Sequence, residues 1–157
     1  MAIVGPSNSG KTEHICRLLE WFTGQGLRPA VLKHSHHQNV GDDGKDTWRY
    51  RQAGARLVAL AAPGVIQITR SGPGEPPLPM ILGEMAQAAD LILVEGYKTS
   101  DLPKIGLAPP DAASPLPDYP GLVAWVSPRP LPTRLPVFNP LQVAAIGRFI
   151  QDHLGGR

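Results

Sequence analysis

The sequence is poor in cysteine, in long apolar runs and in net charge. Cys16 is the only cysteine among 157 residues, so no disulfide framework can stabilise the chain. No apolar run approaches the roughly 20 residues of a membrane span, and the first residues lack the layout of a signal peptide. The net charge of +2 is too small to indicate a nucleic-acid partner. We therefore expect a cytoplasmic protein that binds neither nucleic acid nor membrane.

The remaining composition is that of a globular domain with one unusual stretch. Apolar residues make up 42% of the chain and charged residues 18%, and the length suits one self-sufficient core. Eleven of the 18 prolines lie between Pro103 and Pro140. Because proline interrupts helices, we expect loops joined by short strands there.

The chain carries a complete phosphate-binding motif near its beginning. Residues 5–12 read Gly-Pro-Ser-Asn-Ser-Gly-Lys-Thr, which fits G-x-x-x-x-G-K-[ST]. A short apolar run at 2–4 precedes the motif, and a helical pattern with Ile15, Leu18 and Phe22 follows it. A glycine-rich turn with a surface lysine is the simpler reading, but the flanking strand and helix favour nucleotide binding.

The motif assigns a role to each residue in its second half. Backbone amides would surround a β-phosphate at the start of the helix, from Asn8, Ser9, Gly10, Lys11 and Thr12. The Lys11 side chain would bridge the β- and γ-phosphates, and the Thr12 hydroxyl would bind Mg²⁺.

Strand and helix patterns alternate along the chain. We expect strands over Pro29–Leu32, Leu91–Val94 and Val123–Val126 and around Ile105, while the runs Leu57–Ala61 and Val65–Thr69 are either a hairpin or consecutive strands. We expect helices over Lys11–Gly24, Lys45–Ala53, Met80–Ala88 and Leu141–Leu154, with Cys16 in the core. The fold class is therefore α/β, a mostly parallel β-sheet with helices on both faces, as in P-loop NTPases, forming one nucleotide-binding domain over 1–157.

An acid follows the most apolar strand pattern. Leu91–Val94 leads directly into Glu95 and Gly96. In phosphate-loop proteins such an acid holds Mg²⁺ beside the loop threonine, and Glu95 could also orient a hydrolytic water as the catalytic residue. Gly96 would let the backbone approach the phosphates, and Lys98 would reach an anionic ligand or simply be solvated. A solvated acid at a strand end is the plainer alternative to Glu95 as a ligand.

Two further polar segments are candidates. Lys33-His34-Ser35-His36-His37 follows a strand at the edge where ligands of α/β sheets gather. We favour phosphate or substrate contact by Lys33 and a histidine over a zinc or nickel site of His34, His36 and His37. Residues 41–51 are expected to be poorly ordered without ligand, with Lys45 and Asp46 responding to the γ-phosphate, or else Asp46 only caps a helix.

These segments together resemble the MobB family. The resemblance rests on Gly5–Thr12, Lys33–His37, Gly44-Lys45-Asp46-Thr47, Leu93–Lys98 and Pro103-Lys104-Ile105. It implies a GTP-binding protein with Mg²⁺, usually a homodimer, that assists the molybdopterin guanylyltransferase-type enzyme attaching GMP to molybdopterin. Hydrolysis of GTP would be slow at most.

The chain departs from the family pattern at three places. Glu13 stands where a second Thr or Ser is usual, and Ser127 follows the late strand where the family has Asp. Gly41 stands where an acid is usual, although Asp42 could take that place with a one-residue gap. The residues alone leave two other functions open, a small-molecule kinase and a metallochaperone GTPase. The Pro-rich stretch is unlike a kinase lid, and the lack of paired cysteines disfavours the metallochaperone.

Overall fold

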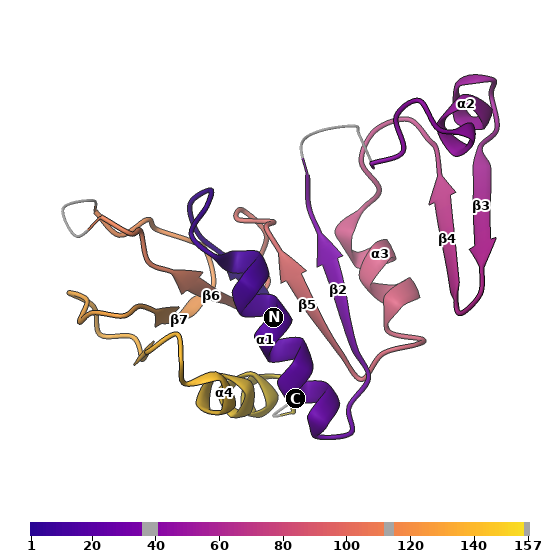
Figure 1. Ribbon diagram of the computed structural model, residues 1–157. Helices are drawn as coiled ribbons and strands as arrows, with labels where there is room; N and C mark the ends of the chain where they lie inside the picture. Colours follow the sequence, from indigo (N-terminus) through magenta and orange to yellow (C-terminus); the bar gives the residue numbers. More distant parts are fainter. Residues whose placement is uncertain (36–40, 112–114, 156–157) are drawn as a thin grey trace. The chain divides into compact units, whose positions relative to one another are not determined.

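The computed structural model describes residues 1–35, 41–111 and 115–155. The chain divides into two compact units, Met1–His34 with Leu82–Arg157, and Ser35–Ile81 (Figure 1). Each unit has its own sheet. Within the described ranges, no helix is both long and apolar enough to pass through a membrane. The single domain expected over 1–157 stays a prediction.

The larger unit is built on a parallel sheet. Its described strands are ordered β2-β5-β1-β6-β7-β8, and each neighbouring pair is parallel. Their bounds are β1 (Ala2–Val4), β2 (Pro29–Lys33), β5 (Leu91–Glu95), β6 (Lys104–Leu107), β7 (Leu122–Val126) and β8 (Val137–Phe138). The parallel sheet expected from the sequence is confirmed. All its strands therefore end at one edge, and the residues that follow them are neighbours.

A charged bridge links the residues that directly precede β2 and β5, at the edge of the sheet where the strands begin. The Arg28 guanidinium donates to both carboxylate oxygens of Asp90 at 2.7 and 3.1 Å, and the Arg28 backbone N–H donates at 2.8 Å. These bonds from Arg28 lower the pKa of Asp90 to about 2. The next residues pair as Pro29 with Leu91, and the register runs on to Lys33 opposite Glu95.

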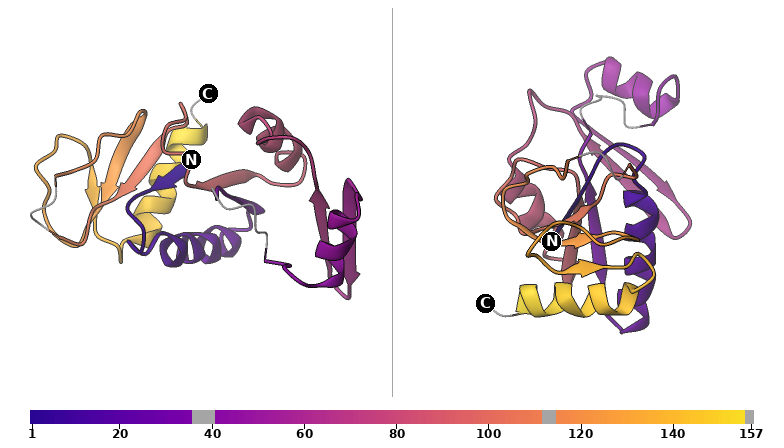
Figure 2. Two further views of the ribbon diagram at one scale, coloured as in Figure 1. Left: turned by 90° about the horizontal axis from the view of Figure 1, so that it is seen from above. Right: turned by 90° about the vertical axis from the view of Figure 1, so that its left-hand side faces the viewer.

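Two helices cover one face of this sheet. Ile3 belongs to a buried cluster with residues of α1 (Lys11–Gly24) and α4 (Val143–Gly155), and the two helices pack against each other (Figure 2). A Cβ at Gly147 would lie 2.3 Å from the Trp21 ring, so the close helix contact needs glycine at this position.

The opposite face is covered mainly by irregular chain. Ala2 and Val4 point to this side because side chains alternate along a strand, and they cluster with Val94, Tyr119 and Trp125. Leu82 of α3 (Leu78–Met85) packs against the cluster, together with leucines of the connecting segments. Helices therefore contact both faces, but loops cover much of the second one.

The smaller unit contains a helix and a hairpin. Strands β3 (Leu57–Ala62) and β4 (Val65–Arg70) pair antiparallel, with Ala62 opposite Val65 across the turn. Helix α2 (Asp46–Gln52) packs on β3. Of the two arrangements that the sequence leaves open, the hairpin is the one formed.

The structure differs from the sequence-based expectations at three points in the helices. Cys16 is exposed, so its expected place in the core is wrong; the buried side of α1 is His14, Ile15, Leu18 and Phe22. Helix α3 starts two residues early because Pro79 is tolerated in a first turn, and it ends at Met85 rather than at the expected Ala88. Helix α4 starts two residues late because the Asn139 side chain accepts the backbone N–H of Leu141 in a preceding turn.

Candidate nucleotide-binding site

The phosphate-binding motif forms the loop between β1 and α1. Asn8 and Gly10 have positive φ angles of 59° and 80°, which glycine and asparagine adopt at low cost. Gly10 is the N-cap of α1 and makes no side-chain capping bond. A Cβ at Gly5 would lie 2.9 Å from the Ser9 hydroxyl and 3.0 Å from the Leu107 carbonyl oxygen. Glycine thus keeps the loop close to the end of β6.

The Lys11 side chain folds back over this loop. Its ammonium donates to the carbonyl oxygens of Gly5 at 3.3 Å and Pro6 at 2.5 Å. The buried Ser9 hydroxyl has no partner among the described residues. An unpaired hydroxyl, an ammonium and an uncapped helix start suit a phosphate, because all of them donate to anions.

The carboxylate of Glu95 joins the loop to β5 and β2. The Thr12 hydroxyl donates to its two oxygens at 3.3 and 3.5 Å, and the Lys33 ammonium lies 3.4 Å from one of them. The Glu95 side chain is only 13% exposed. Oxygens that share an octahedral Mg²⁺ lie about 3 Å apart, so Thr12 and Glu95 are suitably placed to hold one ion.

Three lysines give the site a positive charge. Burial lowers the pKa of Lys11, the Glu95 charge opposes this, and the Lys98 and Lys33 charges lower it further. Lys98 is exposed, in a turn that begins after Gly96. The site therefore combines three cations with the Glu95 carboxylate, and this excess of positive charge favours an anionic ligand.

The conformation of Gly96 has a local cause. Its φ is +98°, and a Cβ there would lie 3.1 Å from the His34 Cβ. The His34 ring stacks on Tyr97 with the centroids 4.3 Å apart. Gly96 thus allows the ends of β2 and β5 to pack together, while its approach to phosphate stays a prediction.

The histidines are only partly described. His34 is in the stack with Tyr97, whereas His36 and His37 lie outside the described residues. In the described ranges, no three His, Cys, Asp or Glu side chains gather as a metal site would require.

The segment 41–51 belongs to the smaller unit and has its own polar anchor. Asp42 is buried and forms an ion pair with Arg51. Burial acts to raise the pKa of Asp42, but hydrogen bonds from Arg51 and Thr47 outweigh it and the pKa is lowered. The backbone N–H of Lys45 also donates to the Asp42 carbonyl at 3.0 Å. Asp42 is therefore held inside the smaller unit by residues of the same segment.

Asp46 does not cap α2. It is the first residue of the helix, Lys45 occupies the N-cap, and no side chain makes a capping bond. The Asp46 carboxylate is 80% exposed and lies 3.9 Å from Arg49. Capping by Asp46 is wrong, and nucleotide contact by Lys45 and Asp46 stays a prediction.

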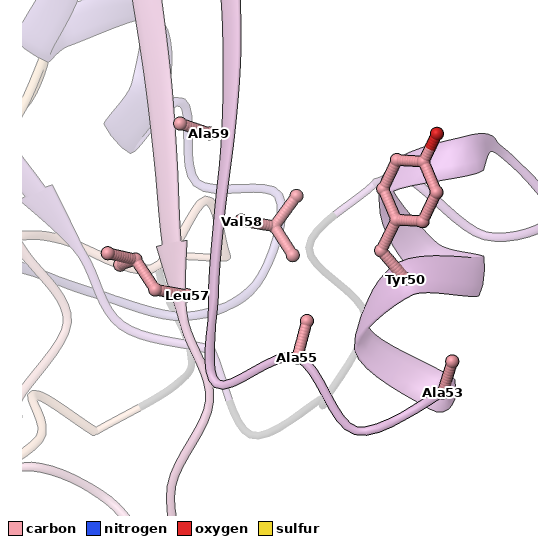
Figure 3. Close-up of a pocket in the computed structure, with 6 residues that line it drawn as sticks. All are labelled: Tyr50, Ala53, Ala55, Leu57, Val58 and Ala59. Atoms are coloured by element: carbon pink, nitrogen blue, oxygen red, sulfur yellow. The ribbon is translucent and has the colours of Figure 1, made fainter.

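The smaller unit also contains an open hollow of about 480 Å³ between α2 and β3 (Figure 3). Val58 points towards α2, where Tyr50 projects. The lining is otherwise apolar, from Ala53, Ala55, Leu57 and Ala59. Its residues include no charged side chain that could orient a phosphate.

A phosphate loop between the first strand and first helix of a parallel sheet, with an acid ending the adjacent strand, defines the P-loop class of α/β folds. The family model for molybdopterin guanine dinucleotide synthesis protein B, MobB, matches residues 1–127. The chain belongs to the MobB family.

Individual relatives agree with this assignment. The molybdopterin-guanine dinucleotide biosynthesis adapter protein of Haemophilus influenzae is 34% identical, over 98% of this chain and 88% of its own length. The solved structure of a molybdopterin-guanine biosynthesis protein B has a TM-score of 0.78 at 26% identity, covering 96% of this chain and 97% of the other. Bacillus subtilis MobB has a TM-score of 0.72 at 30% identity, covering 92% and 93%.

Proposed function

We propose that this protein is a cytoplasmic GTP-binding adapter in the biosynthesis of molybdopterin guanine dinucleotide. Family membership and the names of the relatives support the pathway. The chemistry of the larger unit supports the nucleotide. The choice of GTP over ATP rests on the resemblance to the family alone. Among the described residues, none is identified that distinguishes guanine from adenine.

The observation that carries this proposal is the meeting of Thr12 and Lys33 at the Glu95 carboxylate, beside the Lys11 ammonium. Lys11 and Thr12 begin α1, Lys33 ends β2 and Glu95 ends β5, and together they offer donors for phosphate and oxygens for Mg²⁺. A sheet edge without a ligand role has no reason to gather three lysines, since like charges repel.

The proposed roles follow from these positions. Amides of Asn8, Ser9 and Gly10 bind the β-phosphate, and Lys11 spans the β- and γ-phosphates. Thr12 and Glu95 hold Mg²⁺, which neutralises phosphate charge. Lys33 and Lys98 add positive charge at the same edge. Glu95 could also orient a hydrolytic water, and the resemblance to the family implies that hydrolysis is slow at most.

The adapter role implies a partner enzyme of the molybdopterin guanylyltransferase type. The adapter would bind nucleotide close to that enzyme, which carries out GMP attachment. The test has two parts. Calorimetry should show GTP binding that depends on Mg²⁺ and is largely lost in Lys11→Ala, with unchanged circular dichroism. Guanylation of molybdopterin by the partner should then rise when the wild-type protein is added and not when Lys11→Ala is added.

Other outcomes would point elsewhere. Wild-type affinity in Lys11→Ala would remove the site assignment. Phosphoryl transfer to a small acceptor would indicate a kinase, and one tightly held zinc or nickel per chain would indicate a metallochaperone.

We also propose a homodimer, and the hairpin of the smaller unit supports it. Leu57, Ile66 and Ile68 lie on one face of β3 and β4 by their register, and each is at least 60% exposed. A two-stranded sheet with an open apolar face is unstable alone and aggregation-prone, so a second copy is a suitable cover. Light scattering should show a dimer that Ile68→Lys dissociates and Leu141→Lys, at an exposed leucine elsewhere, does not.

A further inference from the structure

The connection from β5 to β6 contains no helix. Residues 96–103 run from the edge that carries Glu95 to the opposite edge, where Lys104 begins β6, and β1 lies between the two strands. Parallel strands are usually joined through a helix, which satisfies its own backbone groups. An irregular crossover needs other partners for its carbonyls wherever it is buried.

The Lys104 side chain supplies those partners. Lys104 is fully buried, and its ammonium donates to the carbonyl oxygens of Leu102 at 2.9 Å, Pro120 at 2.8 Å and Ser100. Three donors meet three acceptors, so the capacity of the ammonium is used completely. Burial lowers the pKa of Lys104, while the charge of Asp101 opposes this. Such a buried cation is retained only when it is fully hydrogen-bonded.

The same bonds lead back to the candidate site. The hydroxyl and the backbone N–H of Ser100 both donate to the Tyr97 carbonyl, at 2.9 and 3.1 Å. Lys98 lies within this turn, and its charge acts on Lys11. A chain of hydrogen bonds therefore runs from Lys104 through Ser100 to the turn that presents Lys98.

We propose that Lys104 is a positioning residue for the nucleotide site: its buried ammonium fixes the turn 97–100 so that Lys98 stands beside the phosphate loop. This inference rests on the proposed nucleotide binding. It differs from a general stabilising role because it predicts that Lys104 acts on affinity only through Lys98.

A double-mutant cycle tests that difference. Dissociation constants for Mg²⁺-GTP are measured for wild type, Lys98→Ala, Lys104→Met and the double variant. Losing one charge-assisted contact in Lys98→Ala should weaken binding about tenfold. Lys104→Met should cost a similar factor, and the double variant should be no weaker than Lys98→Ala. Arg148→Met, which removes one exposed charge from α4, is the matched control and should show no coupling.

The results separate three cases. If Lys11→Ala keeps wild-type affinity, the nucleotide site itself is wrong. If Lys11→Ala loses binding but the effects of Lys104→Met and Lys98→Ala multiply, Lys104 is only structural and the inference is overturned. Unchanged affinity in a folded Lys104→Met protein overturns it as well.

A second variant covers the case in which Lys104→Met does not fold. A Cβ at Gly121 would lie 2.9 Å from the Leu102 carbonyl oxygen, so Gly121→Ala displaces the same crossover without altering Lys104. Its cycle with Lys98→Ala should give the same lack of additivity. Additive losses there would contradict the proposal equally.

Discussion

Lys33 and Glu95 stand opposite each other in the register of β2 and β5, with the ammonium 3.4 Å from the carboxylate. The Thr12 hydroxyl donates to the same carboxylate. A lysine thus already holds the acid that we assign to Mg²⁺. If Mg²⁺ binds at Glu95 as we propose, the ion would compete with Lys33 for the carboxylate, and the lysine would be released towards phosphate.

This competition gives a prediction for Lys33→Met. Removing the ammonium should lower the Mg²⁺ concentration needed for half-maximal GTP binding, because the ion no longer displaces a cation. Affinity for GTP in the presence of a chelator should fall, since one phosphate-facing charge is lost. Calorimetric titrations at several Mg²⁺ concentrations measure both effects. The same Mg²⁺ requirement in both proteins would show that the Lys33–Glu95 contact is unrelated to the metal.

Glu95→Gln should separate the two modes of binding. Glutamine keeps the size of the side chain but loses the charge that attracts the ion. We expect affinity for Mg²⁺-GTP to fall roughly tenfold or more and metal-free affinity to change much less. Equal losses with and without Mg²⁺ would mean that Glu95 supports the structure only.

Glu13→Thr should tighten nucleotide binding. Glu13 lies in the first turn of α1, next to the proposed phosphates, and pairs with Arg17 at 2.9 Å. Removing the carboxylate relieves its repulsion of the anion, and we expect a gain of roughly threefold to tenfold that diminishes with added salt. Glu20→Thr, at an exposed position of the same helix, controls for net charge. If the control gains as much, the effect is not local.

His14 should make stability depend on pH. It is buried in α1, and burial followed by the Arg17 charge lowers its pKa below the ordinary value of 6.5. The unfolded chain then binds more protons than the folded one, so the free energy of unfolding should fall as pH drops below 6.5. The slope cannot exceed about 1.4 kcal/mol per pH unit for one group. Urea unfolding between pH 5 and 8 should show this slope in wild type and a flatter one in His14→Gln.

The sequence predicts where the loop and Glu95 lie in the fold, because those signals are local. The loop from Gly5 to Thr12 is a contiguous motif, and Glu95 directly ends an apolar strand, so both positions follow from short patterns. The parallel sheet follows from the alternation of strands and helices. The prediction that Cys16 lies in the core is wrong, because Cys16 lies beside the buried face of α1 and not on it.

The contacts that the sequence does not reveal depend on tertiary structure. Arg51 forms an ion pair with Asp42, nine residues earlier in the chain, and both side chains are largely buried. The sequence of 41–51 shows the charges but not this pairing. Lys104 is recognisable only as a lysine at the start of an apolar strand. Its structural role depends on the carbonyls of Leu102 and Pro120, which the folded chain brings together around the Lys104 ammonium.

The Arg28–Asp90 bridge affects the distant site through the register of β2 against β5. It sits at the amino ends of β2 and β5, roughly 16 Å from Lys33 and Glu95 at 3.3 Å per residue. β2 is an edge strand, and a slip of one residue would turn every side chain to the other face, taking Lys33 away from Glu95. The hydrogen bonds from Arg28 hold the pKa of Asp90 well below its ordinary value, which favours the charged form of the bridge. The hydrogen bonds between Arg28 and Asp90 therefore favour the register that places Lys33 opposite Glu95 at the other end of the two strands.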